Sequence, residues 1–531
     1  MRKQLQAKAA QLAATSATPV ASLENDYLQS LLWLTPSNPF GTAESTTISF
    51  AFGGARSYTI DDPESTVDRL RATGWNTGSI ASADTFLPNG DRVAVAGLPI
   101  EQAAVLVALA AWIAPTNLTL APAADFETAT FKFLVTNEAG MREFWSGERG
   151  VLGFSELPND YGPNYGYYGE EEQPYSPGYA VFNQEGYGWT SGGLTPGGYG
   201  YVTVLHEIGH LFGLDHPWDE GGVYWENGTQ HAEPGFPGAT ASKTGVNGLN
   251  QGVFTTMTYN DGWSGQPSKS ANWGYQIGPG AFDIAAMQKL YGTDASHHAG
   301  DDSYTLPEAN AAGTGWFCLW DAGGMDTIKA PLNAGAATID LRAATLIEGD
   351  AGAGGYVSWV KGIAGGFTIA KGAVIENAEG GNGADTLIGN QSGNVLKGHG
   401  GADRLQGGSG ADMLWGGAGN DVFAFKTLAD FRSGADLSAA CIDTVSDFVR
   451  GQDKLEFRGF DADPVADGVQ AVSFRFVGTD KSFVANDRSV AELRFDSRTH
   501  TLHGDCNNDG ALDFQIMMLG VSSLSATDFL L

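Results

Sequence analysis

Apolar positions in the first half of the chain predict short strands and one buried helix. A run over residues 103–114 is almost wholly apolar and is bounded by Pro99 before it and Pro115 after it. A membrane span needs roughly 20 apolar residues, so this run predicts a helix buried against a sheet. Residues 54–88 are polar and predict loop, with room for one helix. Alternating or β-branched apolar runs predict strands at 46–52, 130–135, 150–154 and 179–182.

The second half of the chain has a period of nine residues. Blocks begin at residues 380, 389, 398, 407 and 416. The sixth place holds Asp385, Asn394, Asp403, Asp412 and Asp421, and the eighth holds Leu387, Leu396, Leu405, Leu414 and Phe423. A glycine linker would not keep both places in phase, so the blocks predict repeated turns and short strands. Each turn offers carbonyls and one carboxylate, and oxygen ligands alone suit Ca²⁺. The second block, with Ser392 at its fourth place and Asn394 at its sixth, is expected to bind more weakly.

Length, charge and cysteine content limit the classes of protein. A chain of 531 residues predicts two or three domains. Lys and Arg total 29 and Asp and Glu 61, a formal charge of −32, which argues against binding to nucleic acid or to an anionic membrane. Bound cations are expected to offset this charge. Cys318, Cys441 and Cys506 are too few for a disulfide framework, although one bridge is possible.

The chemistry concentrates in residues 206–217, which read H-E-x-x-H-x-x-G-x-x-H-P. On a helix, His206 and His210 share a face and can reach one ion. Gly213 allows the chain to leave the helix with positive φ, and His216 returns as a third ligand. Three neutral nitrogen ligands leave zinc one open position, the catalytic pattern. A bare H-E-x-x-H arises often by chance, whereas the added Gly and third His do not. The remaining histidines are expected at the surface: His231, His297, His298, His399, His500 and His503.

These motifs resemble the metzincin metalloproteases, and more narrowly the serralysins. Thr256-Met257-Thr258-Tyr259-Asn260 is similar to their Met-turn, although Thr258 stands where Ser is usual. The resemblance implies that Met257 is the floor of the site and that Tyr259 is a zinc-proximal phenol. Residues 283–292 resemble the helix that closes the catalytic domain, with Phe282 where a second Asp is common. The implied fold is an α+β metzincin catalytic domain, with a twisted mixed sheet and a zinc helix, followed by an all-β parallel β-roll.

The nonapeptides resemble the RTX repeats of the same family, and two upstream segments resemble its other calcium-binding segments. The resemblance implies structural Ca²⁺ ions held by Asp321, Gly323, Asp326, Glu376, Gly381, Gly383, Asp385, Gly401, Asp403, Gly408, Gly410, Asp412, Gly417, Gly419 and Asp421. A further segment, 505–510, has the spacing D-x-N-x-D-G of a calcium loop, with Asp513 nearby. Ile516 stands where an EF-hand has its last glutamate, so this signal is weak.

The family resemblance also predicts the organisation of the chain. Residues 1–25 lack the apolar segment of a secretory signal peptide and resemble a propeptide. The protease domain is expected over 26–300 and the RTX region over 301–531. By position, residues 150–157 resemble the antiparallel edge strand that pairs with an extended substrate. The terminal residues 528–531, one acidic residue followed by apolar ones, resemble the uncleaved signal of type I exported proteins, and a short tail packed on the roll is the alternative.

The implied function is a secreted zinc endopeptidase with one catalytic Zn²⁺. Glu207 is the expected general base, and Tyr259 the expected group that stabilises the oxyanion. The implied partners are protein substrates, the type I secretion machinery and a cognate protein inhibitor, and the location is extracellular or at the cell surface. Two other functions stay open: a calcium-dependent surface or matrix protein with a vestigial zinc site, and a protein that processes only its own leader.

Overall fold

The structure of the chain is a computed structural model that describes residues 47–59, 69–78, 80–144, 150–156, 178–218, 223–226, 229–232, 235–265, 267–433, 436–462, 471–483 and 490–531. The chain divides into two compact units. Unit 1 comprises Met1–His297, Ala309–Trp320 and Ala344–Gly355, and unit 2 comprises His298–Glu308, Asp321–Ala343 and Tyr356–Leu531. The propeptide expected over residues 1–25 lies outside the described residues.

A mixed five-stranded sheet forms the centre of unit 1. Its order is β6 (Thr119–Pro122), β1 (Thr47–Phe52), β7 (Phe131–Thr136), β9 (Gly178–Asn183) and β8 (Gly153–Glu156). The first four strands run parallel, whereas β8 pairs with β9 antiparallel at the edge. Every residue of the central strand β7 is buried, as expected for a strand covered on both faces. The sheet is therefore of the mixed type predicted, with its antiparallel strand at an edge.

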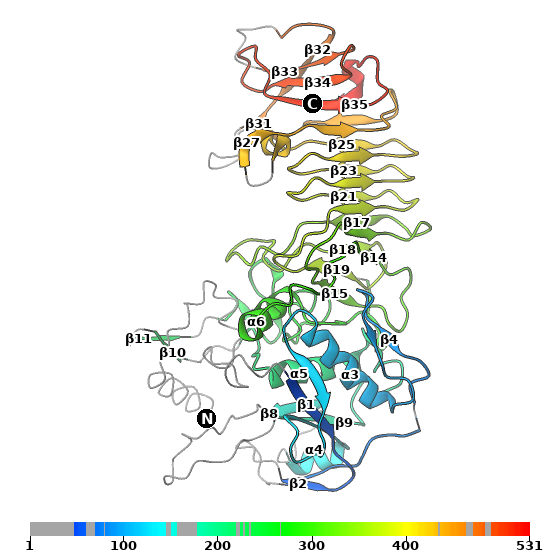
Figure 1. The fold of residues 1–531 in the computed structure, drawn as a ribbon, viewed down its shortest axis with the longest axis vertical. Coiled ribbons are helices and arrows are strands. Elements are labelled where there is room, and N and C mark those ends of the chain that lie inside the picture. The colour runs from blue at the N-terminus through cyan, green and yellow to red at the C-terminus, as the bar shows by residue number, and fades with distance from the viewer. Residues whose placement is uncertain are drawn as a thin grey trace. The chain divides into compact units, whose positions relative to one another are not determined.

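Two helices cover one face of this sheet (Figure 1). Helix α3 (Ile100–Ile113) is the predicted apolar helix, and it ends just before Pro115. It packs on α5 (Tyr199–Leu211), where the Trp112 indole donates to the Leu205 carbonyl at 2.9 Å. Phe131 of the sheet packs edge-on against Phe212 at the end of α5, with ring centroids 5.1 Å apart. The central sheet thus sets the position of α5.

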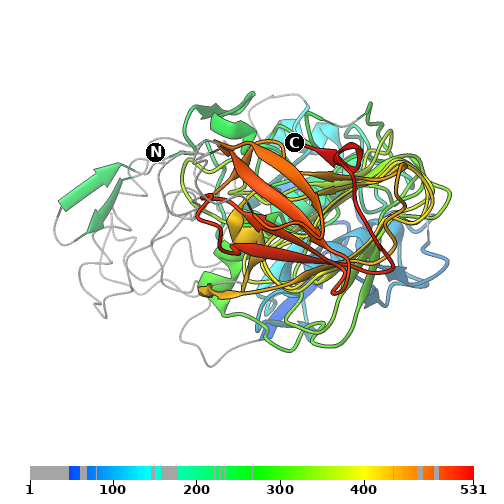
Figure 2. The same cartoon turned by 90° about the horizontal axis from the view of Figure 1, so that it is seen from above.

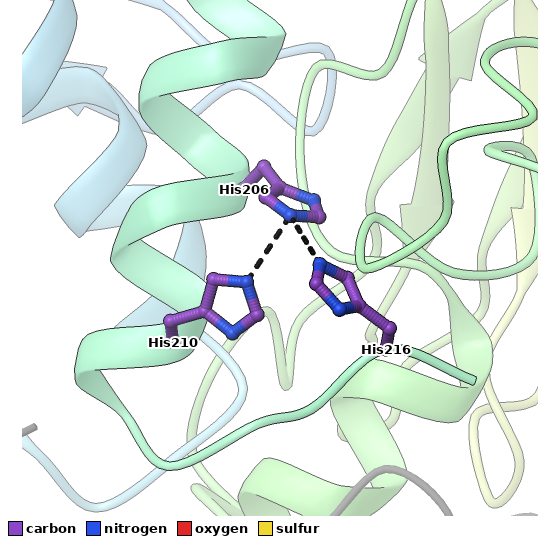
Figure 3. A group of neighbouring side chains, drawn as sticks. All are labelled: His206, His210 and His216. Carbon is purple, nitrogen blue, oxygen red and sulfur yellow. Dashed lines mark hydrogen bonds between the residues drawn. The ribbon is translucent and has the colours of Figure 1, made fainter. Parts of the chain in front are cut away.

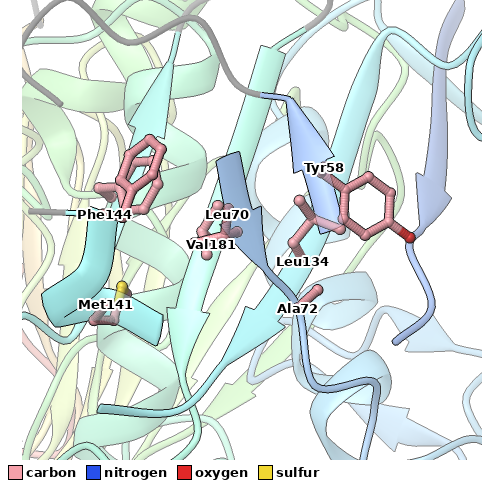
Figure 4. Packing of buried hydrophobic residues seen from close by; sticks show 8 residues of the cluster. Tyr58, Leu70, Ala72, Leu134, Met141, Phe144 and Val181 are labelled. Atoms are coloured by element: carbon pink, nitrogen blue, oxygen red, sulfur yellow. The ribbon is translucent and has the colours of Figure 1, made fainter. Parts of the chain in front are cut away.

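A second cluster covers the opposite face (Figure 4). Residues of β2 (Ser57–Thr59), β3 (Arg69–Arg71) and α4 (Glu138–Phe144) pack there on the sheet. The cluster consists of Tyr58, Leu70, Ala72, Leu134, Met141, Phe144, Phe154 and Val181. The prediction of loop for residues 54–88 was wrong at this point, because β2 and β3 form an antiparallel hairpin. Each strand is only three residues long, which is too short to show an alternating pattern in the sequence. Its apolar residues pack instead on residues that are distant in the sequence.

The remaining elements of unit 1 are short. Helix α6 (Ala281–Tyr291) corresponds to the closing helix expected over residues 283–292. The others are β4 (Thr85–Phe86), β5 (Arg92–Val93), β10 (Val223–Glu226), β11 (Thr229–Ala232), β12 (Ala239–Thr240), β13 (Lys243–Thr244), the 3-10 helix η1 (Val246–Gly248) and β15 (Trp316–Leu319). No helix in the described part of the chain is long and apolar enough to cross a membrane.

Successive nonapeptides of unit 2 contribute strands alternately to two sheets, and within each sheet these strands pair parallel. One sheet receives β20 (Asn377–Glu379), β22 (Val395–Lys397) and β24 (Met413–Trp415), and the other receives β21 (Thr386–Ile388), β23 (Arg404–Gln406) and β25 (Val422–Ala424). Neighbours in one sheet are therefore 18 residues apart, and Leu387 pairs with Leu405, which pairs with Phe423. All five residues at the eighth place are fully buried between the sheets. Seen from above, successive strands of this repeat region overlie one another (Figure 2).

Further strands extend both sheets. The first sheet adds β14 (Ser303–Thr305), β16 (Thr327–Lys329), β28 (Asp443–Val445), β35 (Phe514–Met518), β34 (Thr501–Asp505), β33 (Ala491–Asp496) and β32 (Phe474–Thr479). The second adds β19 (Gly366–Ile369), β18 (Ser358–Val360), β17 (Ala337–Asp340), β29 (Lys454–Glu456) and β36 (Phe529–Leu530). Minor elements are η2 (Leu428–Phe431), β26 (Arg432–Ser433), β27 (Asp436–Ala440), β30 (Phe460–Asp461), β31 (Ala471–Val472) and η3 (Ala526–Asp528).

Three details of the sequence-based predictions are settled by these elements. The terminal residues pack as strand β36, parallel to β29. Cys318, Cys441 and Cys506 form no disulfide in the described residues, so the possible bridge is absent. His503 is buried in β34 rather than exposed, because its Nε2 hydrogen-bonds with the Thr501 hydroxyl at 2.8 Å inside the sheet. His231 lies in β11, and its side chain is outside what the structure describes.

Candidate functional site

Helix α5 and the turn after it bring the three motif histidines together. The helix carries His206, Glu207 and His210 and ends at Leu211. Gly213 follows with φ of 86°, the positive value expected from its place in the motif, and its amide donates to the His210 carbonyl at 2.8 Å. This turn reverses the chain so that His216 meets the two helical histidines (Figure 3). The local sequence therefore builds the cluster within eleven residues.

The geometry of the three imidazoles fits a bound cation. His206 Nε2 lies 3.2 Å from His210 Nε2 and 3.2 Å from His216 Nε2. A tetrahedral zinc ion with Zn–N distances of about 2.0–2.1 Å separates its nitrogen ligands by about 3.3 Å. The His206 and His210 Nδ1 atoms lie 3.0 and 2.7 Å from the carbonyls of Thr256 and Leu214. A carbonyl only accepts, so both rings carry their proton on Nδ1 and direct an Nε2 lone pair at the common point.

The protonation state of the cluster agrees with this arrangement. Burial, and next the proximity of His216, lower the pKa of His206 to about 3, although the Thr256 carbonyl acts in the opposite direction. The ring is therefore neutral and available as a ligand near neutral pH. Neighbouring lone pairs without a proton between them repel each other, and a cation at their centre removes that repulsion.

Glu207 lies beside the histidine cluster and is itself buried, at 9% exposure. Burial raises the pKa of its carboxyl to about 7, and a hydrogen bond from the Ser155 hydroxyl opposes that rise. The Ser155 oxygen is 2.9 Å from Glu207 Oε2 and 2.8 Å from the Glu207 carbonyl oxygen. A carboxyl group with a pKa near neutrality can both take and return a proton.

Residues 255–257 form the floor below α5. Met257 is fully buried, and a side chain at Gly209 of α5 would place its Cβ 2.4 Å from Met257 Sδ. Gly209 therefore permits the close approach of the helix to this methionine. Asp283 of α6 holds the same segment by accepting from the Thr255 hydroxyl and the Thr256 amide, each at 2.6 Å. Sequence reasoning missed this role of Asp283, although an acidic residue in the first turn of a helix was a signal for a capping position.

Tyr259 stands at the open side of the cluster, with 58% of its surface exposed. Its ring centroid is 5.5 Å from that of His206 and 4.8 Å from that of His216. Trp218 packs against both His216 and Tyr259. Its ring centroid lies 4.6 Å from that of His216, at an interplanar angle of 14°, and 4.7 Å from that of Tyr259. Trp218 was not predicted, and its only signal was an aromatic residue two positions after a candidate ligand.

The aspartates of the nonapeptides form ladders along unit 2. Asp403 Oδ1 accepts from the Asp385 amide at 2.8 Å, and Asp421 Oδ1 accepts from the Asp403 amide at 2.9 Å. Asp412 Oδ1 accepts from the Asn394 amide at 2.8 Å in the other ladder. Within the described residues, the Oδ2 atoms of Asp403, Asp412 and Asp421 have no hydrogen-bond partner. A buried carboxylate oxygen without a donor is costly, and a bound cation would offset that cost. A site with only oxygen ligands suits Ca²⁺.

The chain is similar to one described family and to several named metalloproteases. Residues 281–531 match the family described as Peptidase M10 serralysin C terminal. The chain is serralysin-like. It is 34% identical to Metallopeptidase AprA of Pseudomonas marginalis over 341 residues, which are 62% of each chain. It is 35% identical to Serralysin G of Dickeya chrysanthemi over 338 residues, 61% of each chain. With Metalloprotease AprA of Pseudomonas entomophila it shares 29% identity over 521 residues, 92% of this chain and 95% of that one.

The matched stretch thus spans about three fifths of the length of two of these relatives and nearly all of the third. In this serralysin-like chain, the glycines of the first repeat differ in backbone conformation from those of the later repeats. Gly401, Gly408, Gly410, Gly417 and Gly419 have positive φ, between 91° and 151°. Gly381 and Gly383 are outside that region, and a Cβ at either glycine would meet backbone atoms of residues 331–336.

A third acidic group lies upstream of the repeats in unit 2. Carboxylate oxygens of Asp302, Asp321 and Asp326 lie within 4.8 Å of one another, and Asp302 was not predicted. Burial, opposed by the Asp302 amide and reinforced by the neighbouring carboxylates, raises the pKa of Asp326 to about 7. Glu376 joins through its Oε2, which accepts from the Asp326 amide at 2.8 Å. Asp321 and Asp326 were predicted together, because residues 320–327 resemble a calcium-binding segment of the family.

The acidic loop at residues 505–513 is closed on itself. Asp505 accepts from the amides of Gly510 at 2.8 Å and Asp509 at 3.3 Å. Asp513 accepts from the Cys506 amide at 2.6 Å. These carboxylates hold the backbone of their own loop.

Proposed function

We propose that this chain is a secreted zinc endopeptidase whose unit 2 depends on calcium for folding. The observation that carries the proposal is the convergence of three imidazole nitrogens beside a buried carboxylate, with His206 Nε2 at 3.2 Å from the other two, a separation typical of zinc ligands. The names of its relatives support peptidase activity, and the metalloprotease comparison implies a metal. A module that only binds its partner has no need of the Glu207 carboxylate at this place.

Each residue would have a distinct task in peptide hydrolysis. His206, His210 and His216 would hold zinc, which when bound supplies an acidified water and polarises the scissile carbonyl. Glu207 would take a proton from that water and return it to the leaving amine. Tyr259, exposed and next to two of the histidine rings, would donate to the oxyanion of the substrate. An extended peptide would add to the edge of β8 through main-chain hydrogen bonds, which would permit a loose sequence preference.

Unit 2 would couple folding to export. Where calcium is scarce, the carboxylates of its ladders should lack cations and unit 2 should stay largely unfolded. An unfolded segment suits passage through the type I secretion machinery. Outside the cell, binding of calcium by the predicted aspartates and glycine carbonyls would become folding free energy. The substrates would be extracellular proteins, and a cognate protein inhibitor would protect the producing cell.

The test is Glu207→Ala in the full chain. We expect this variant to bind one zinc ion, as measured by metal analysis after gel filtration, and to lose casein cleavage. Glu127→Ala, which removes a 70% exposed carboxylate on unit 1, is the matched control and should retain activity. Casein cleavage by Glu207→Ala would refute the assignment. N-terminal sequencing of both proteins separates a general endopeptidase from one that processes only its own leader.

A further inference from the structure

The edge strand β8 turns alternate residues toward open space. The Leu152 carbonyl accepts from the Asn183 amide, so the pair 152–183 is hydrogen-bonded, and the register continues as Gly153↔Phe182 to Glu156↔Tyr179. In an antiparallel pair, hydrogen-bonded and non-hydrogen-bonded positions alternate. Gly153 and Ser155 are therefore the residues whose main-chain amide and carbonyl point away from β9. Within the described residues no strand pairs with this edge of β8, so these groups can receive an extended peptide.

The side-chain positions of the same two residues face Glu207. The Ser155 hydroxyl lies 2.9 Å from Glu207 Oε2 and 2.8 Å from the Glu207 main-chain oxygen. A Cβ at Gly153 would lie 3.0 Å from Glu207 Cγ and 3.3 Å from Phe182 Cδ1. Gly153 thus leaves room for the glutamate side chain, and Ser155 supplies the group that holds it.

We propose that Ser155 is a positioning residue that fixes the Glu207 carboxylate relative to the strand that receives the substrate. The inference rests on the proposed function and adds to it a residue that the motif does not contain. A glutamate side chain has three rotatable bonds, and its carboxylate must meet the reacting water in one orientation. A hydroxyl held between the carboxylate and the carbonyl of the same residue selects that orientation. The main chain of Ser155 would also bind the substrate backbone. One residue would therefore fix both the position of the peptide and the orientation of the Glu207 carboxylate.

The consequence for kinetics is a loss in kcat without a loss in KM. Ser155→Ala keeps the main-chain groups of β8 but removes the hydrogen bond to the carboxylate. A hydrogen bond to a charged group corresponds to a factor of about 10–100 in rate, so kcat should fall by about that factor. KM should stay within about twofold, because the backbone edge is unchanged.

The experiment measures kcat and KM on an extended fluorogenic peptide with the full-length, zinc-loaded chain. Ser155→Thr keeps the hydroxyl and should recover most of the rate, and Ser57→Ala, on the exposed side of β2, should match the wild type. Zinc content and melting temperature should be equal in all variants. In the Glu207→Gln background, Ser155→Ala should change the residual rate by less than about twofold, since the hydroxyl acts only through that carboxylate.

The outcomes are distinct. If the wild type is active and Glu207→Ala is inactive, but Ser155→Ala has the wild-type kcat, the positioning role alone is overturned. A rise in KM with unchanged kcat would also overturn it, because the side chain would then act on substrate binding. If Glu207→Ala itself cleaves the peptide, the proposed function fails and the positioning role fails with it.

Discussion

Removing calcium should make unit 2 less stable at alkaline pH than at acidic pH, and Asp403 shows why. Its side chain is 1% exposed, and its Oδ2 has no hydrogen-bond partner in the described residues. Burial raises the pKa of this carboxyl from 3.8 to about 7, the Asp385 amide opposes the rise, and the charges of Asp385 and Asp421 add to it. The folded protein without calcium therefore prefers the protonated form of Asp403.

The sign and size of the effect follow from that difference. Because the folded-state pKa lies above the unfolded value, the stabilisation is complete below about pH 4 and is lost as the pH rises through about 7. Between pH 5 and pH 8 this one carboxyl removes roughly 2–3 kcal/mol from the free energy of unfolding. For a unit of this size, that corresponds to a fall of roughly 5–10 °C in Tm. Burial raises the pKa of Asp412 to about 8, so this carboxyl acts in the same direction.

Under the proposed function, calcium should reverse the trend, because it would bind the carboxylate and compete with the proton. The assay is thermal unfolding of the full chain, followed by circular dichroism at pH 5 and pH 8, in EGTA and in millimolar calcium. A transition whose Tm shifts with calcium would be assigned to unit 2. We expect its Tm in EGTA to be lower at pH 8 than at pH 5, and its Tm in calcium to be higher at pH 8.

The matched variant is Asp403→Asn, which copies the natural Asn394 at the same place of its block. There the amide oxygen accepts from the Asn390 amide at 2.8 Å, so the turn forms without a carboxylate. The variant should reduce the pH-dependent fall of Tm in EGTA by roughly 5–10 °C and should bind less calcium. A chelated wild type that is as stable at pH 8 as at pH 5 would refute the reasoning, and so would an unchanged slope in Asp403→Asn.

Three other changes probe the candidate zinc site. Trp218→Ala should weaken zinc binding about tenfold in a chelator competition, and Trp218→Phe much less, because the ring stacked on His216 helps to orient that ligand. Gly209→Ala should lower the free energy of unfolding by about 1–3 kcal/mol in urea titrations, since its Cβ would meet Met257 Sδ at 2.4 Å, and an unchanged midpoint would contradict the packing. Asp283→Ala should destabilise unit 1 by about 2 kcal/mol or more, because it leaves buried donors unpaired.

How far the sequence alone could lead depended on how local each interaction is. His206, His210 and His216 were predictable, because a helix period and one glycine bring them together within eleven residues. Ser155 contacts Glu207 across 52 positions of the chain, and no period links a strand residue to a helix residue at that distance. A tertiary contact of this kind has no signature in one sequence.

The repeats show the same limit at their end. Up to residue 421 the spacing of nine made each ladder position readable from the sequence. Asp443 and Asp453 then continue the ladders, and each accepts from the main-chain amide of the preceding aspartate, Asp412 or Asp421, at 3.0 Å. They come 31 and 32 residues after those partners instead of 18, so the period that revealed the earlier members is broken. Inserted segments displace them in sequence, whereas parallel pairing keeps them in register.

Both candidate metal regions contain buried donor atoms that a cation would stabilise. In unit 1, buried imidazole nitrogens direct lone pairs at a common point beside a carboxyl whose pKa is raised by burial. In unit 2, buried aspartates keep an oxygen without a donor among the described residues. In both places a cation would offset the desolvation of the donors. Unit 2 should also release protons on binding metal near neutral pH, because burial raises the pKa of Asp403 to about 7 and that of Asp412 to about 8. The formal charge of −32 is then the charge of the metal-free chain, and bound cations would reduce it. The stability of the protein should therefore be measured at several metal concentrations.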